Sequence, residues 1–392
     1  MLDPLKQAVI EAADRLSPEL VQISRFLHAN PELAFEENQA AELLTRTMEA
    51  HGFSVERGVA GLSTAFTATY TSGDGPTIAY LAEYDALPGL GHACGHNLIA
   101  SGSVGAALAL KSCLDQVPGS VLLVGCPAEE KGGGKIPLVE SGVFQWVDAA
   151  MLVHPSNRTE IVKQALGMRD VTVEFFGKAA HAAAVPHLGI NALDAVILTF
   201  NNINALRQQV RSDARIHGII THGGKAPNII PDYAAALFYV RALDIEYLDE
   251  LYQKVLACFE AAANATGTRY QVKRAGYDYH PHKINYTLAQ IFRHNLESLG
   301  GQVDQGPEDG ELGSTDVGNV SQVVPTLQPT ITICGPKVSC HMAEFAVASG
   351  SAAGEEGMLQ AARAMALTGL DLLKDRDALD RVKAEFTGGR RP

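Results

Sequence analysis

The pattern of hydrophobic and polar positions divides the chain into two kinds of segment. Residues 77–85, 120–130 and 148–156 are apolar over most of their length, whereas residues 40–53 repeat apolar positions at helical spacing. Continuous rather than alternating apolarity is typical of strands buried on both faces, as in a parallel sheet covered by helices. The first part of the chain therefore predicts an α/β domain.

The pattern changes from about residue 168 onwards. The new segment predicts, in chain order, a strand, a helix, two strands, a helix and a strand, at residues 169–177, 191–210, 215–224, 233–244, 246–267 and 269–275. This order is that of a ferredoxin-like α+β unit. A helix, a strand-forming segment at 326–335 and a helical region from about Ala352 follow it.

The simplest organisation is an α/β domain that is split in sequence by an inserted domain. We expect its two parts at residues 1–167 and 282–392, with the insertion at 168–281. The length of 392 residues agrees with two domains, because it exceeds the size at which a single hydrophobic core stops growing.

Charge and composition exclude several classes of partner. The net charge is -13 and no run of five basic residues occurs, so nucleic acid and anionic membranes are poor candidates. No uninterrupted apolar stretch reaches the ~18 residues of a membrane span, and the N-terminal segment does not resemble a signal peptide. Six cysteines in a chain of this length do not suggest a disulfide framework. We therefore expect a cytoplasmic protein.

Each of the three predicted buried strands ends in polar residues. They are Glu83 and Asp85 in the first, Glu129 and Glu130 in the second, and His154 in the third. In open α/β sheets, ligands bind at the carboxyl ends of the strands, so these side chains could converge on one crevice.

The segment GHACGHN at residues 91–97 allows three interpretations of Cys94. It could be a small buried hydrophobic residue, a nucleophile that uses a nearby base, or a thiolate ligand of a metal ion beside His96. The glycine-rich stretches around it and at 131–137 lack the spacing of nucleotide-binding loops. We interpret them as turns in which glycine permits close backbone packing.

Adjacent carboxylates at a strand end also allow more than one interpretation. Glu129 and Glu130 could form a solvated loop, but successive side chains of an extended segment point in opposite directions. One carboxylate could then bind metal while the other faces a water molecule. Together with Cys94, His96, His154 and the later His341, Glu130 would complete a site for two divalent ions.

The motifs as a set resemble peptidase family M20, the dinuclear metallopeptidases of the aminoacylase and carboxypeptidase type. In chain order they are LHANPELAFEE, AEYDALPGLGHACGHN, PAEEKGGGK, HPS, GKAAHAAAVPHLGINAL, NIIPDYA, GSTDVGNVS and CHMAEFA. Within the family, the sequence is most similar to the amidohydrolase branch, near the aminobenzoyl-glutamate hydrolase subunit and dipeptidases that act on β-alanyl-type dipeptides.

The resemblance implies a role for each matching residue. The implied metal ligands are Cys94, His96, Glu130, His154 and His341. Glu129 would be the general base, and Asp85 would orient a ligand. His181, Asn228 and Arg241 of the inserted domain would contact the substrate. Two positions depart from the family pattern, namely Glu83, where carboxypeptidase relatives have a liganding histidine, and Asn97, where many amidohydrolases have aspartate.

The resemblance also implies the activity and the assembly. We expect a metal-dependent amidohydrolase that cleaves N-acyl amino acids or small dipeptides with two divalent ions per chain, zinc first and manganese or cobalt as alternatives. The inserted domain would serve as a lid and would form a homodimer. Two other hypotheses remain: a cysteine-nucleophile amidase that uses Cys94, and a non-catalytic ligand-binding subunit of a hetero-oligomer.

Overall fold

A computed structural model describes residues 3–274, 276, 278–304 and 312–388. The chain divides into two compact units. The first comprises Met1–Lys163, Lys283–Glu311 and Asn319–Pro392, and the second comprises Gln164–His282 and Leu312–Gly318. The second unit contains the predicted insertion at 168–281 together with the short segment Leu312–Gly318, which is not part of that prediction.

The first unit contains a mixed sheet of six strands. In spatial order the strands are β1 (Ser54–Arg57), β2 (Phe66–Thr71), β4 (Ser120–Cys126), β3 (Thr77–Glu83), β5 (Ala149–Met151) and β11 (Thr326–Leu327). The four strands from β4 to β11 are mutually parallel, whereas β1 and β2 form an antiparallel edge. The helix-covered, mostly parallel sheet predicted from the sequence is thus confirmed, and the antiparallel edge is an addition to it.

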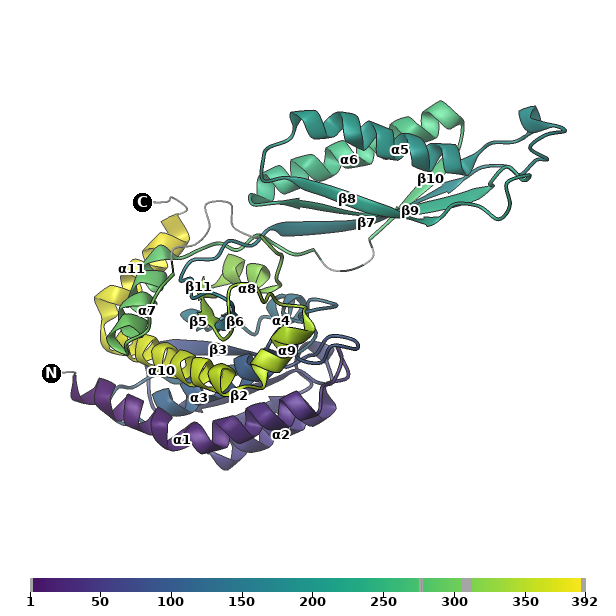
Figure 1. The fold of residues 1–392 in the computed structure, drawn as a ribbon. Coiled ribbons are helices and arrows are strands. Elements are labelled where there is room, and N and C mark those ends of the chain that lie inside the picture. The colour runs from purple at the N-terminus through teal and green to yellow at the C-terminus, as the bar shows by residue number, and fades with distance from the viewer. Residues whose placement is uncertain (1–2, 275, 277, 305–311, 389–392) are drawn as a thin grey trace. The chain divides into compact units, whose positions relative to one another are not determined.

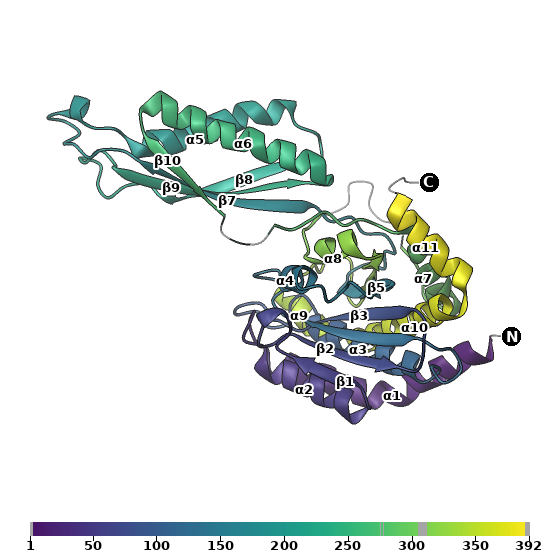
Figure 2. The same ribbon diagram turned by 180° about the vertical axis from the view of Figure 1, so that it is seen from behind.

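Helices surround this sheet in both views of the ribbon (Figures 1 and 2). They are α1 (Pro4–Ala29), α2 (Asn38–Ala50), α3 (His96–Lys111), α4 (Lys135–Glu140), α7 (Tyr286–Ser298), α9 (Ala343–Ser349), α10 (Ala352–Lys374) and α11 (Arg376–Gly388). A further helix, α8 (Val317–Val323), begins in the second unit and ends in the first.

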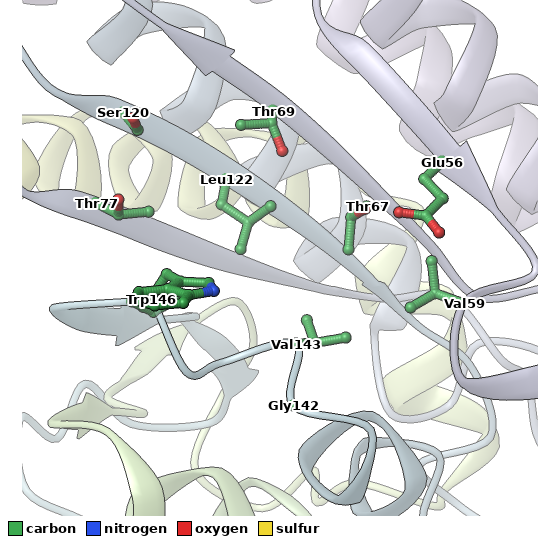
Figure 3. A pocket seen from close by; sticks show the side chains of 11 residues that line it. Glu56, Val59, Thr67, Thr69, Thr77, Ser120, Leu122, Gly142, Val143 and Trp146 are labelled. Carbon is green, nitrogen blue, oxygen red and sulfur yellow. The ribbon is translucent and has the colours of Figure 1, made fainter. Parts of the chain in front are cut away.

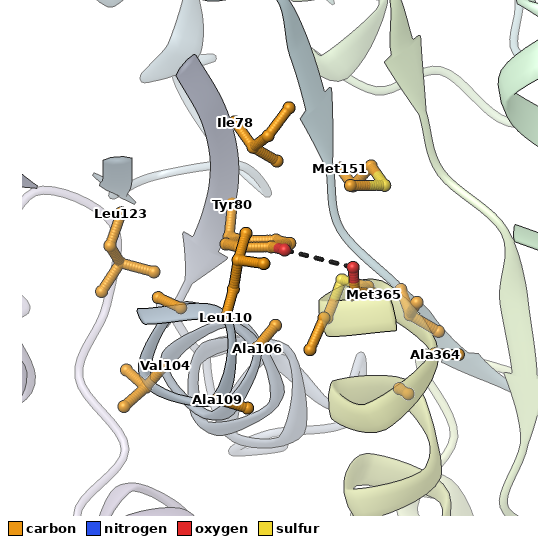
Figure 4. Close-up of a cluster of buried hydrophobic side chains, with 14 of the residues drawn as sticks. Ile78, Tyr80, Val104, Ala106, Ala109, Leu110, Leu123, Met151, Ala364 and Met365 are labelled. Atoms are coloured by element: carbon orange, nitrogen blue, oxygen red, sulfur yellow. Dashed lines mark hydrogen bonds between the residues drawn. The ribbon is translucent and has the colours of Figure 1, made fainter. Parts of the chain in front are cut away.

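The core of the first unit is packed where α3 and α10 meet one face of β3 (Figure 4). The ring of Tyr80 lies between the two helices, and its hydroxyl donates a hydrogen bond of 3.1 Å to the carbonyl of Met365. Gly369 provides the space for this ring, because a Cβ at that position would lie 2.3 Å from the Tyr80 oxygen. This packing fixes β3, whose last residue, Glu83, enters the candidate site.

The strand predicted at 148–156 is interrupted in the structure, so that part of the prediction is wrong. The chain forms β5 and then β6 (His154–Ser156), which pairs with β12 (Thr330–Thr332) in a separate two-stranded sheet. Leu152 and His154 still donate to the carbonyls of Leu327 and Pro329. The ladder is broken because Pro329 has no N–H to return, and His154 therefore begins a strand rather than ending one.

The second unit is a four-stranded antiparallel sheet with two helices on one face (Figure 1). Its elements in chain order are β7 (Gly167–Phe176), α5 (Ala192–Leu206), β8 (Arg215–His222), β9 (Tyr233–Ala242), α6 (Ile245–Thr266) and β10 (Arg269–Lys273). The spatial order β10-β7-β9-β8 and the antiparallel pairing confirm the predicted ferredoxin-like unit. Ala275, the predicted end of the last strand, lies outside the described residues.

Candidate active site

A glycine turn brings the predicted ligands Cys94 and His96 against the start of β6. Gly95 has a φ of 79° and caps α3, and a Cβ there would lie 2.5 Å from the ring of Pro155. Only glycine fits this close approach without a shift of the neighbouring chain. As a result, the Cys94 Sγ lies 3.4 Å from the Nε2 of His154.

His96 is fully buried and is oriented by Asp85. Its Nδ1 lies 2.9 Å from the backbone oxygen of Asp85 and 3.0 Å from the Asp85 Oδ1, two acceptors that keep the proton on Nδ1. Its Nε2 lies 3.9 Å from the Oε1 of Glu130. Within the described part of the chain, this Nε2 has no hydrogen-bond partner. Asp85 thus holds the ring so that Nε2 points to the centre of the cluster.

The carboxylates around His96 favour a positive charge at this point. Burial alone would lower the pKa of His96, but the charge and hydrogen bond of Asp85, with the charges of Glu83 and Glu130, raise it well above its usual value. Burial likewise opposes the ionisation of Asp85, yet its interactions with His96 lower its pKa below the usual value. A buried, acidic environment of this kind suits a bound cation.

The turn after β4 places Glu129 and Glu130 in the same cluster. The N–H of Glu130 donates to the Asp85 Oδ2 at 3.0 Å. The Glu130 Oε1 lies 3.3 Å from the Nε2 of His341, and the Glu130 carboxylate raises the pKa of that histidine. His341 has a φ of 70°, and its N–H donates to the carbonyl of Ala93 at 2.8 Å. Segments far apart in sequence therefore meet at one place in the first unit.

Among the described residues of the first unit, three groups of side chains have potential ligand atoms within 4.8 Å of one another. They are Cys94 with His96 and His154, Cys94 with Glu130 and His341, and His96 with Glu129 and Glu130. All five predicted ligands and the predicted base are thus among these residues.

The donor set fits transition-metal ions. Thiolate, imidazole and carboxylate are the ligands that zinc and similar divalent ions prefer in proteins. The buried His96 Nε2 and Glu130 Oε1, each without a hydrogen-bond partner in the described residues, both lie in this cluster. A bound cation would satisfy both atoms.

Sequence reasoning missed a buried ion pair beside the cluster. Lys135, in a stretch interpreted only as a turn, is fully buried, and its Nζ lies 2.6 Å from the Glu83 Oε1. The other oxygen of Glu83 lies 3.6 Å from the His96 Nε2. The glycines before Lys135 do have the predicted packing role, because a Cβ at Gly134 would lie 2.0 Å from the carbonyl of Pro127.

The surroundings of Cys94 do not favour the thiolate form of its side chain. A hydrogen bond with Cys340 and burial raise its pKa well above the usual value for cysteine. Cysteine nucleophiles are commonly activated by a lowered pKa, which Cys94 lacks, although the His154 Nε2 lies 3.4 Å from its Sγ. These surroundings suit a ligand whose proton is displaced by a metal ion.

The predicted substrate residues lie in the second unit. His181 and Asn228 are in neighbouring segments, joined by a backbone hydrogen bond of 3.0 Å from Ala182 to Asn228. His181 is exposed, whereas Arg241 on β9 is partly buried and donates to the Ser314 hydroxyl at 3.2 Å. The structure therefore brings two of the three together within this unit.

A cavity of about 320 Å³ lies elsewhere, on the face of the first unit's sheet near β2 and β4 (Figure 3). Thr67, Thr69 and Leu122 line it, and Trp146, which is 78% exposed, lies at its side. None of the predicted ligands lines this cavity.

Among the described helices, none has the length and apolar character needed to cross a membrane.

Comparison with known proteins identifies the family. The sequence pattern of Peptidase family M20/M25/M40 matches residues 79–368. The chain is 41% identical over 400 residues to Xaa-Arg dipeptidase of Mus musculus, covering 98% of this chain and 93% of the relative. It is 32% identical over 432 residues to one of the subunits of p-aminobenzoyl-glutamate hydrolase of Escherichia coli, covering 91% of this chain and 89% of the relative.

A solved structure shares the fold. A dinuclear metal binding peptidase of family M20 from Bacillus subtilis superimposes with a TM-score of 0.73 at 21% identity, covering 92% of this chain and 99% of that protein. The chain belongs to peptidase family M20/M25/M40 and is a hydrolase of peptide or related amide bonds, as its motifs predicted.

Proposed function

We propose that the chain hydrolyses dipeptides or N-acyl amino acids with two divalent ions and with Glu129 as the general base. The proposed ligands are Cys94, His96, Glu130, His154 and His341. The observation that carries the proposal is the meeting of thiolate, imidazole and carboxylate atoms within 4.8 Å of one another beside the Glu129 carboxylate. Zinc is the first candidate metal, with manganese and cobalt as alternatives.

The chemistry follows from the placement of the two adjacent carboxylates. Divalent ions held by these residues would supply Lewis acidity and would lower the pKa of a water molecule to about 7. Glu129 would accept the proton of the attacking water and return it to the nitrogen of the leaving amine. General acid–base catalysis of this kind contributes typically ~10²- to 10⁴-fold to the rate.

His181 is suited to donate a hydrogen bond to the substrate carbonyl. Its Nδ1 accepts from the N–H groups of Ala183 and Ala184 at 3.3 and 3.2 Å. A neutral imidazole with an accepting Nδ1 carries its proton on Nε2, which is then a donor. We assign this donor to the developing oxyanion, a role typically worth ~10²- to 10³-fold in turnover.

Arg241 and Asn228 are proposed to bind the leaving amino acid. The Nε of Arg241 is buried without a hydrogen-bond partner among the described residues, and the planar guanidinium matches the geometry of a carboxylate. A free carboxylate on the leaving group is a property of both a dipeptide and an acylated amino acid. The relatives named for Xaa-Arg dipeptides and for p-aminobenzoyl-glutamate support the same substrate class.

A substrate panel tests the proposal. The metal-free protein would be loaded with zinc, manganese or cobalt and assayed on Xaa-Arg dipeptides, β-alanyl dipeptides, aminobenzoyl-glutamate and N-acetyl amino acids. We expect turnover that chelator removes and that Glu129→Gln abolishes. Activity that survives strong chelation but is lost on alkylation of Cys94 would instead identify a cysteine amidase. Substrate binding without turnover under every metal would identify a non-catalytic subunit.

We also propose a cytoplasmic homodimer formed through the second unit. Its edge strand β8 exposes Ile219 and Ile220 at 62% and 46%, and Ile197 on α5 is 46% exposed. Apolar side chains on an unpaired strand edge favour association with another copy. The six cysteines are all free, which fits a reducing compartment. Equilibrium sedimentation of the wild type and of Ile219→Lys would test the dimer.

A further inference from the structure

Glu37 is a buried carboxylate that contacts the turn leading to Glu129. It directly precedes α2, and none of its surface is exposed. Its Oε1 accepts hydrogen bonds from the N–H groups of Phe35 and Ala128 at 3.0 and 2.9 Å. Its Oε2 accepts from the Thr64 hydroxyl at 2.8 Å. The carboxylate therefore joins three segments, and one of them carries the proposed base.

Ala128 adopts a backbone conformation that needs support. Its φ of 58° lies in the left-handed region, which is unfavourable for a residue with a Cβ. Such conformations persist where the surrounding structure holds them. Glu37 holds the N–H of Ala128, and the N–H of Gly133 donates to the Ala128 carbonyl at 2.9 Å.

The proposed base and ligand lie between two such supports. Glu37 fixes the residue before Glu129, and Asp85 accepts from the N–H of Glu130 at 3.0 Å. The direction in which the Glu129 side chain leaves the backbone depends on the dihedral angles of this turn. An error of ~1 Å in the position of a catalytic group can cost ~10²-fold in rate.

We propose that Glu37 is a positioning residue, which holds Ala128 in the left-handed conformation and thereby aims the Glu129 carboxylate at its target. The inference rests on the proposed role of Glu129 as general base. Without the Glu37 carboxylate, Ala128 can relax to a negative φ, and the chain that follows it rotates. Glu130 keeps its own support from Asp85, so metal binding depends less on Glu37 than turnover does.

The test compares Glu37→Ala with Glu37→Gln. The glutamine oxygen can still accept from Phe35 and Ala128, and its amide can donate to the Thr64 hydroxyl, which also accepts. We expect kcat to fall by ~10- to 100-fold in Glu37→Ala, with KM and bound metal little changed, and to recover to within a few-fold of wild type in Glu37→Gln.

Glu32→Ala is the matched control. Its carboxylate lies in the same segment and accepts from the N–H groups of Gln39 and Ala40 at the start of α2, at 3.1 and 2.9 Å. This variant should lower the melting temperature and leave kcat unchanged. An equal loss of kcat in Glu32→Ala and Glu37→Ala would overturn the inference.

A double-mutant cycle with Ala128→Gly tests the route of the effect. Glycine adopts positive φ without strain, so Glu37→Ala should cost less in kcat when residue 128 is glycine. Additive effects would overturn the inference. If Glu37→Ala does not fold, Glu37→Asp, whose shorter side chain does not reach the Ala128 N–H, takes its place. Glu129→Gln separates the two claims, because full activity in that variant would refute the proposed base itself.

Discussion

Replacing Asp85 with Asn should weaken metal binding without removing the fold. The Asp85 carboxylate is 1% exposed and accepts from two donors, the His96 Nδ1 on one oxygen and the Glu130 N–H on the other, both at 3.0 Å. An amide offers only one oxygen, so its NH₂ group must face one of these donors. The substitution therefore disturbs one proposed ligand, whichever way the amide turns.

The expected magnitude follows from the contact that is lost. Substitution of a group that orients a metal ligand typically costs ~10- to 100-fold in metal affinity, or about 1.4 to 2.7 kcal/mol. If the NH₂ faces His96, the ring is driven to carry its proton on Nε2, the nitrogen that lies 3.9 Å from Glu130 and must be free to bind metal. The backbone oxygen of residue 85 remains as an acceptor at 2.9 Å, so affinity should fall within this range rather than vanish.

Competition with a chromogenic chelator measures the zinc dissociation constant of wild type and Asp85→Asn. Asp148→Asn is the control, since the Asp148 carboxylate accepts from the Thr77 N–H at 2.7 Å, at the opposite end of β3 from the cluster. The control should lose stability and keep its zinc affinity. Unchanged affinity in Asp85→Asn, or an equal loss in both variants, would refute the reasoning.

Four further outcomes are expected. The purified protein should carry or take up about two divalent ions per chain, and elemental analysis that finds none in active protein would contradict this. Glu129→Gln should keep its metal but lose ~10²- to 10⁴-fold in kcat, whereas Glu130→Gln should lose metal. Metal content and kcat would be measured on both variants, and the reverse pattern would exchange the two roles. Mixing inactive His181→Ala with inactive Glu129→Gln should restore part of the activity if His181 of one chain completes the active site of the other chain in the proposed dimer. Verified subunit exchange without recovered activity would exclude such shared active sites. Burial raises the pKa of Glu37 in the folded protein. The contribution of Glu37 to stability is therefore present below its unfolded-state pKa and is lost as pH rises through its folded-state pKa. Urea unfolding from pH 4.5 to 7.5 should show that the wild type loses stability relative to Glu37→Gln.

The parts of the fold that depend on local pattern could be predicted from the sequence. The strands β3 and β4 are buried at every position but the first. Their continuous apolar sequence predicts this burial. The edge strand β1 is short and mostly exposed, so its sequence carries little hydrophobic signal. The break between β5 and β6 depends on Pro329, which lies on a segment far along the chain. Local pattern cannot reveal such a partner.

The candidate site shows the same division. Cysteine, histidine and paired carboxylates are recognisable by residue type, and the structure brings the five predicted ligands together. Lys135 carries no such signal, because lysine is rarely buried unless it is paired, and its partner Glu83, at 2.6 Å, lies on a distant segment. Glu37 lies 91 residues before Ala128, and nothing in its own segment indicates that contact. Residues that act through a distant backbone group leave no local signature.

These residues together explain why the cluster should favour a cation. Glu83, Asp85, Glu129 and Glu130 bring four carboxylates to one part of the first unit, whereas Lys135 contributes a single positive charge. Uncompensated buried charge is costly, so either the carboxylates share the protons of His96 and His341 or a cation offsets them. The pKa values of both histidines are raised, because the neighbouring carboxylates stabilise their protonated forms. A divalent ion would displace those protons and take over their role, so metal binding at this site should release protons and become tighter as pH rises through the histidine pKa values.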